Sequence, residues 1–137
     1  MDVYLNEYKT IFDSYGILNI FLVTPQTSDK RIKQIDEVSE GFIYTVSSAS
    51  VTGSNSGVSN DMESYFDRLN AMNLRNPRLI GFGIKDHATF RKASNYAAGA
   101  IIGSAFIRVL ADSEDLENDI KNFVREVKQE PEEVITT

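Results

Sequence analysis

The sequence predicts an α/β fold: a partial (β/α)8 barrel of about four parallel βα units, with an extra N-terminal helix and a short extra helix after the last strand. Three observations predict it. Short apolar runs typical of buried strands alternate with stretches of helical periodicity. Two glycine turns, Gly81-Phe82-Gly83 and Gly103-Ser104, directly follow the last two of these runs. The chain has 137 residues, where a complete barrel typically needs about 250, and it opens on a helix.

The first part of the chain predicts a helix followed by two strands. Apolar residues at helical spacing predict the helix over residues 3–15. Residues 20–23 and 42–46 are the first two strands, and the helix between them has Thr27 or Ser28 as its N-cap. Because consecutive parallel strands are joined by right-handed crossovers, these elements begin a parallel sheet.

Residues 47–60 form an uncharged stretch rich in serine and glycine. Loops beyond about 12 residues in compact domains are frequently functional. We interpret this stretch as a lid over a site, and a passive linker is the alternative.

The second part of the chain repeats the strand–helix pattern. Asn60 with Glu63 can form the capping box of a helix that runs to about residue 73. The elements expected after it are, in order, strand 79–83, a helix to about residue 96, strand 97–102, helix 104–110 and helix 113–129. Residues 1–130 are therefore expected to be the C-terminal half of a barrel, with residues 131–137 as a loose acidic tail.

Composition narrows the function classes. The net charge is −6, and nine acidic against three basic residues from Asp112 onward account for it, so no basic face for nucleic acid is expected. No apolar run approaches the roughly 20 residues of a membrane span, and the first 20 residues do not resemble a signal peptide. The absence of cysteine excludes disulfides and thiolate metal sites and is compatible with the cytoplasm, where we expect the protein.

The two glycine turns predict a phosphate site. Glycine at the carboxyl end of a strand lets the backbone approach a ligand and leaves N–H groups free to donate. In (β/α)8 barrels a phosphate site is frequently built by the loops after strands 7 and 8. Gly83, Gly103 and the hydroxyl of Ser104 would occupy those places, although glycine at a strand end can also be a plain structural turn.

Four segments carry a resemblance to a known family. They are, in order, Gly41 to Ser47 (GFIYTVS), Ser50 to Gly53 (SVTG), Gly81 to Ile84 (GFGI) and Gly99 to Ala105 (GAIIGSA). In sequence and approximate spacing they resemble the tryptophan synthase alpha chain, over nearly the whole length to about Gln129. The resemblance maps the chain onto strands 5 to 8 of that family's barrel.

The resemblance implies a lyase. The family cleaves indole-3-glycerol phosphate into indole and glyceraldehyde 3-phosphate by a retro-aldol reaction, which needs an acid for the indole carbon and a base for a hydroxyl proton. The family takes these two carboxylates from early strands that this chain lacks, so the chain alone is expected to be inactive, with no catalytic residue of its own.

The resemblance also implies roles for particular residues. Gly53, Gly83, Gly103 and Ser104 would hold the substrate phosphate, helped by the amino end of the helix over 104–110. Two aromatic residues, Tyr44 and Phe82, would line the indole pocket, although both can equally be core residues. Thr52, on the lid, would position a catalytic carboxylate.

Other polar residues are given no catalytic role. Asp61, Asp86 and Asp112 stand where helix caps are expected, and His87 is expected to be an exposed first-turn residue. A single histidine without a second ligand predicts no metal site. Lys85 is interpreted as solvated surface.

The expected partners follow from the family and from the missing half. The family's beta subunit carries pyridoxal phosphate, so we expect no cofactor in this chain. An isolated half-barrel exposes strand edges and apolar faces, which predicts a homo-oligomer of half-barrels. The alternative function is a self-associating half-barrel that binds a phosphorylated ligand without catalysis. A barrel acting on sugar phosphates as an epimerase or isomerase is a third possibility, disfavoured by Tyr44 and the Ser-Val-Thr-Gly segment.

Overall fold

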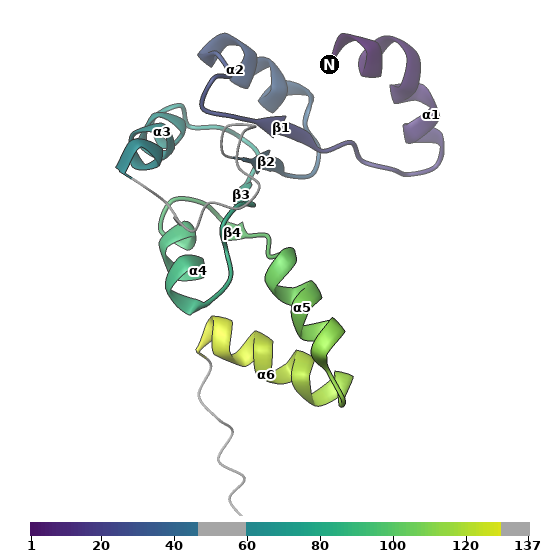
Figure 1. Cartoon of the computed structure of the whole chain (residues 1–137). Helices are drawn as coiled ribbons and strands as arrows, with labels where there is room; N and C mark the ends of the chain where they lie inside the picture. The colour runs from purple at the N-terminus through teal and green to yellow at the C-terminus, as the bar shows by residue number, and fades with distance from the viewer. Residues whose placement is uncertain (47–59, 130–137) are drawn as a thin grey trace, which may run out of the picture.

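Four parallel strands form one sheet in a computed structural model, which describes residues 1–46 and 60–129 (Figure 1). The strands lie side by side in chain order: β1 (Phe21–Val23), β2 (Ile43–Thr45), β3 (Arg78–Ile80) and β4 (Gly99–Ala100). Every neighbouring pair is parallel. The predicted partial barrel is confirmed.

The helices follow the predicted order. Their bounds are η1 (Tyr4–Tyr8), a π-helical turn that continues into α1 (Lys9–Ser14), then α2 (Asp29–Val38), α3 (Asn60–Ala71), α4 (His87–Ser94), α5 (Ser104–Asp112) and α6 (Leu116–Lys128). Ser28 is the N-cap of α2, where its Oγ accepts from the backbone N–H of Arg31 at 3.2 Å. The capping box expected of Asn60 lies outside the described side chains.

The last two strands are shorter than predicted. The N–H of Gly81 still donates to the carbonyl of Thr45 at 3.1 Å, but the backbone then turns through Gly83, whose φ is +62°. That left-handed conformation ends the strand. After β4 the pairing continues one residue further, since the N–H of Ile101 donates to the carbonyl of Ile80 at 2.8 Å.

The two faces of the sheet differ in burial. Val23, Thr45 and Ile80 are in register on one face and are fully buried. They pack against α2, α3 and α4, whose buried side chains are Ile32, Ile35, Tyr65, Phe66, Leu69 and Ala93. The opposite row includes Leu22, which is 56% exposed. This more exposed side of the sheet, made by Leu22, Tyr44, Leu79 and Gly99, is called the open face below.

Exposed large apolar side chains occur at only two places in the described chain. One group runs from Val3 through α1 to Leu22 in β1, and the other lies in α5 and α6. We call them the N-terminal flank (Val3, Tyr8, Ile11, Tyr15, Ile17, Leu18 and Leu22) and the C-terminal flank (Ile107, Leu110, Leu116 and Val124). None of the described helices is long and apolar enough to cross a bilayer.

Candidate functional site at the carboxyl edge of the sheet

The candidate site lies where the parallel strands end. Ile80 pairs with Ala100 as the last residues of β3 and β4. Gly83 and Gly103 each follow three residues later, so both leave the same edge of the sheet from neighbouring strands. The loop from Thr24 to Asp29 leaves that edge after β1.

Tyr44 and Gly81 form one packed unit at this edge. The hydroxyl of Tyr44 donates to the carbonyl of Gly81 at 3.1 Å. A Cβ placed on Gly81 would lie 2.3 Å from the Tyr44 ring, well inside van der Waals contact. A larger residue at position 81 would therefore have to displace the Tyr44 ring, so Gly81 lets that ring keep its place on the open face.

Phe82 joins the site to the core. Its ring stacks on Phe66 with the centroids 6.2 Å apart and the planes at 21°, and Phe66 is fully buried. Phe82 is itself only partly buried. Its position thus combines a core contact with Phe66 and a part of the ring that stays accessible.

Gly103 has a different reason to be glycine. A Cβ there would meet nothing within 4 Å among the described residues, and its φ of −108° is not left-handed. Neither crowding inside the fold nor a left-handed backbone requires it, in contrast to Gly81 and Gly83. The space beside its Cα is open to a ligand.

The amino end of α5 has donors to offer. Gly103 is the N-cap and supplies no side-chain hydrogen bond to the first turn. The first N–H groups of a helix have no intrahelical acceptor, and the helix dipole adds positive potential there. Ser104 is exposed beside them. This arrangement can receive an anion such as a phosphate group.

Two of the predicted site residues cannot be placed, because Thr52 and Gly53 lie outside the described residues. So does most of the stretch interpreted as a lid. The predicted residues that the structure gathers at one edge are therefore Tyr44, Phe82, Gly83, Gly103 and Ser104.

Of the three aspartates expected to cap helices and given no catalytic role, the structure confirms the cap at one and not at another. Asp86 is the N-cap of α4, as expected, and hydrogen bonds from the backbone and side chain of Thr89 hold the pKa of its carboxyl below the ordinary value. Asp112 was expected to cap a helix, which is wrong: it ends α5, and Asp115 caps α6 because a short link separates the helices. The side chain of Asp61 lies outside the described ones.

His87 is not the exposed residue that was expected. Its Nδ1 lies 2.7 Å from the carbonyl oxygen of Val127, so the ring joins α4 to the end of α6 and is partly buried between them. No cluster of three or more histidine, cysteine, aspartate or glutamate side chains suited to a metal occurs in residues 1–46 and 60–129.

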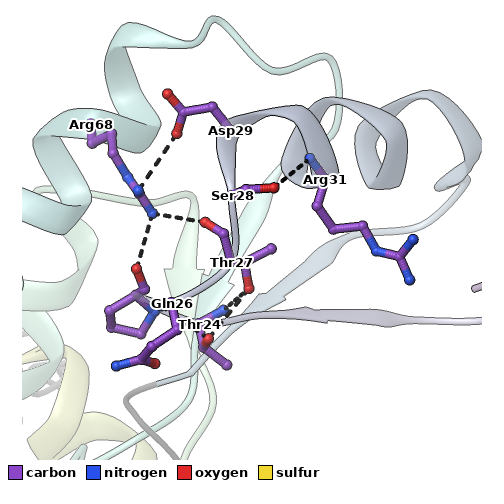
Figure 2. Close-up of polar contacts among 8 residues, drawn as sticks. Thr24, Gln26, Thr27, Ser28, Asp29, Arg31 and Arg68 are labelled. Carbon is purple, nitrogen blue, oxygen red and sulfur yellow. Dashed lines mark hydrogen bonds and ion pairs between the residues drawn. The ribbon is translucent and has the colours of Figure 1, made fainter.

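Sequence reasoning missed one residue at this edge, Arg68 of α3. Its guanidinium reaches the loop between β1 and α2 and contacts Pro25, Thr27 and Asp29 (Figure 2). The loop also borders a hollow of about 520 Å³. No local pattern marks this residue, because its partners are about 40 positions away in the sequence.

Comparison with solved structures places the fold in its class. The chain superposes on the tryptophan synthase alpha subunit of Pyrococcus furiosus with a TM-score of 0.75 at 26% identity, covering 95% of this chain and 52% of that one. The alpha subunit from Campylobacter jejuni matches with a TM-score of 0.70. The chain is thus an α/β protein of the (β/α)8-barrel class, of which it contains about half.

Sequence comparison gives the family. The family model of the tryptophan synthase alpha chain matches residues 4–136. Over 128 residues the chain is 57% identical to the tryptophan synthase alpha chain of Flavobacterium johnsoniae and 56% identical to that of Christiangramia forsetii. Each alignment covers 93% of this chain but only 50% and 49% of those relatives, so the chain spans about half their length. The chain belongs to the tryptophan synthase alpha chain family, a family of lyases in tryptophan biosynthesis.

Proposed function

We propose that this chain supplies the phosphate and indole side of an alpha subunit that cleaves indole-3-glycerol phosphate into indole and glyceraldehyde 3-phosphate. The observation that carries the proposal is the open Gly103 at the uncapped amino end of α5. Because no described atom crowds that position, the backbone is open to a ligand there, and a bound phosphate accounts for the glycine.

Each predicted residue has a part in this function. Gly83, Gly103 and Ser104 bind the phosphate, together with Gly53. The indole ring lies against Tyr44, held by Gly81, and against the accessible side of Phe82. Thr52 positions a carboxylate. No described residue of this chain is assigned as the acid or base, so we propose that the chain alone binds substrate without cleaving it.

The proposed partner for the complete activity is a beta subunit. A solved structure similar to this chain, with a TM-score of 0.73, belongs to the tryptophan synthase α2β2 complex of P. furiosus. We expect pyridoxal phosphate in that subunit, no cofactor in this one, and both in the cytoplasm.

A second candidate function is self-association of half-barrels with ligand binding but no catalysis. It is favoured by the position of the exposed apolar side chains, which occur on the N-terminal and C-terminal flanks and nowhere else in the described chain. Those flanks adjoin β1 and β4, the two open edges of the sheet. Two copies would pair β1 of each with β4 of the other and bury both flanks.

The phosphate site is tested by thermal unfolding with glycerol 3-phosphate. We expect the ligand to raise the melting temperature, because it binds the folded state only. The variant Gly103→Leu should lose that shift, since its side chain occupies the open space. The control is Ser94→Leu, which places the same side chain at another exposed position, the C-terminal end of α4. A shift that persists in Gly103→Leu contradicts the phosphate assignment.

Catalysis and assembly need separate measurements. Purified chain given indole-3-glycerol phosphate should release no indole, and clear turnover would show that a carboxylate of this chain does the chemistry. Sedimentation should show a self-associated species under either candidate function, and a stable, well-behaved monomer would contradict the predicted self-association.

A further inference from the structure

Arg68 makes contacts that join two separate βα units. One terminal nitrogen of its guanidinium, Nη2, donates to the carbonyl of Pro25 at 3.3 Å and to that of Thr27 at 3.2 Å (Figure 2). The other, Nη1, lies 3.5 Å from the Asp29 carboxylate. Arg68 belongs to α3, the helix after β2, whereas all three partners belong to the loop after β1 or the first residue of α2.

The loop already has a compact turn that Arg68 holds in place. The N–H of Thr24 donates to the hydroxyl of Thr27 at 3.0 Å, and the N–H of Thr27 donates to the carbonyl of Thr24 at 3.0 Å. Gln26 donates its N–H to the Thr24 hydroxyl at 3.2 Å. These bonds shape the turn locally, but they do not fix it relative to the rest of the sheet edge. The bonds from Arg68 do.

The hydrogen bonds to the two carbonyls matter more than the ion pair. The Asp29 side chain is 60% exposed and that of Arg68 is 38% exposed, and exposed pairs of this kind contribute little. A guanidinium is planar and offers its donors in a fixed geometry, so less conformational freedom is lost for each hydrogen bond than with a flexible lysine ammonium. The Arg68 group also lies 5.6 Å from the centroid of the buried Tyr65 ring, which supports its plane.

The β1–α2 loop that Arg68 contacts lies at the edge of the sheet where the candidate site is. The loop leaves the same carboxyl edge as Gly83 and Gly103. Its residues Thr24, Gln26, Thr27 and Ser28 also border a hollow of about 520 Å³ on the β1 side, which is completed by Met1, Phe21, Leu22, Arg31 and Ile35. We propose that Arg68 is a positioning residue for the carboxyl-edge site: it fixes the β1–α2 loop against α3 and so sets the shape of this side of the site. The consequence for ligand binding rests on the proposed function.

Hydrogen exchange of the loop amides tests the contact itself. In Arg68→Met, exchange across Thr24 to Asp29 should become about tenfold faster, while exchange in α4 to α6 stays unchanged. Arg68→Lys should lie between the two, because its ammonium keeps the charge and N–H donors but lacks the fixed planar geometry of the guanidinium. The matched control is Arg91→Met, which removes an exposed arginine of α4. Unchanged loop exchange, or a uniform rise over the whole chain, overturns the proposal.

Ligand affinity, measured by calorimetry with indole-3-glycerol phosphate, tests the positioning role. Arg68→Met should bind about fivefold more weakly, with partial recovery in Arg68→Lys, and Arg91→Met should bind like the unchanged chain. A loosened loop with unchanged affinity overturns the positioning role, since Arg68 would then be merely structural. If the unchanged chain binds no ligand, the proposed function fails, and the exchange rates alone still decide whether Arg68 fixes the loop.

Discussion

The two ends of α2 are held by two arginines in contrasting ways. At its C-terminal end, on the amino edge of the sheet, the Arg75 guanidinium donates to the carbonyls of Asp36, Glu37 and Ser39. In return the Asp36 carboxylate accepts from the backbone N–H of Arg75 at 2.7 Å and of Asn76 at 2.9 Å. At the N-terminal end, Arg68 donates to the carbonyls of Pro25 and Thr27 and pairs with the exposed Asp29 carboxylate.

This difference indicates that the network at the amino edge stabilises the fold, whereas the contact at the carboxyl edge sets the position of one loop. The network at the amino edge is reciprocal, so that removing one member leaves several others without partners, and it satisfies the last carbonyls of a helix. The contact at the carboxyl edge is a single side chain across a loop. In (β/α)8 barrels the active site lies at the carboxyl edge, while features at the amino edge serve stability. The predictions below test whether this chain follows that division.

The largest effect is expected from Asp36→Ala. The variant removes the acceptor of both backbone bonds and of a third bond from the Asn76 side chain at 2.9 Å. Charge-assisted bonds of this kind make the expected loss of unfolding free energy about 2 kcal/mol. Urea unfolding followed by circular dichroism measures it, with the exposed Glu37→Ala as control. Equal losses in the two variants would contradict the special role of the network.

Acid should weaken the same network. Burial of the Asp36 carboxyl raises its pKa. Hydrogen bonds from Arg75 and Asn76, together with the charge of Arg75, lower the pKa by more than burial raises it, so the net pKa is below the ordinary value. A lowered folded-state pKa gives stability that is complete above the unfolded-state value of about 3.9 and is lost as pH falls through the folded-state value. The difference in stability between the unchanged chain and Asp36→Ala should shrink over that acid range, and a pH-independent difference would refute this account.

At the carboxyl edge, Gly81→Ala should cost less stability but change the site more. The new methyl group would overlap the Tyr44 ring, which must move and give up its bond to the Gly81 carbonyl. Overpacking that a side chain relieves by moving is expected to cost about 1.5 kcal/mol. Chemical unfolding measures this cost, and calorimetry should show weaker binding of indole-3-glycerol phosphate. Full affinity in this variant would exclude Tyr44 from the indole pocket.

Removing only the Tyr44 hydroxyl distinguishes the effect of its hydrogen bond from the effect of its aromatic ring. Tyr44→Phe loses the 3.1 Å bond to Gly81 but keeps the aromatic surface, so a stability loss of about 1 kcal/mol is expected. Ligand affinity should change less than in Gly81→Ala. If affinity falls further in Tyr44→Phe, the hydroxyl itself contacts the ligand, and the packing explanation is wrong.

The sequence predicted the elements well because their signals are local. The alternation of apolar runs with helical periodicity gave four parallel strands in chain order, and Ser28 and Asp86 both cap helices. The strand ends were predicted less well, since the predicted strand 79–83 included the Gly81-Phe82-Gly83 turn, whereas β3 ends at Ile80 and the backbone turns at Gly83. His87 failed for a related reason: its partner, Val127, is 40 residues away.

The candidate site was predictable as glycine positions but not as three different kinds of glycine. Only the folded chain shows that Gly81 makes room for Tyr44, that Gly83 has a left-handed backbone and that Gly103 borders open space. The two arginine contacts were equally hidden. Arg68 and Arg75 read as ordinary charges near the end of a helix, and their acceptors are backbone carbonyls, which every residue has.

The smallest effect, expected from Asp29→Asn, sharpens the comparison most. It removes the counter-charge of Arg68 while leaving both carbonyl bonds, and the pair is exposed and 3.5 Å long. Loss of this pair and of a favourable charge in the first turn of α2 should cost about 0.5 kcal/mol, and less at high salt. Exchange of the loop amides should stay near that of the unchanged chain. Should Asp29→Asn loosen the loop as much as Arg68→Met does, the ion pair and not the carbonyl bonds holds the loop, and the carboxyl edge would depend on charge as the amino edge does.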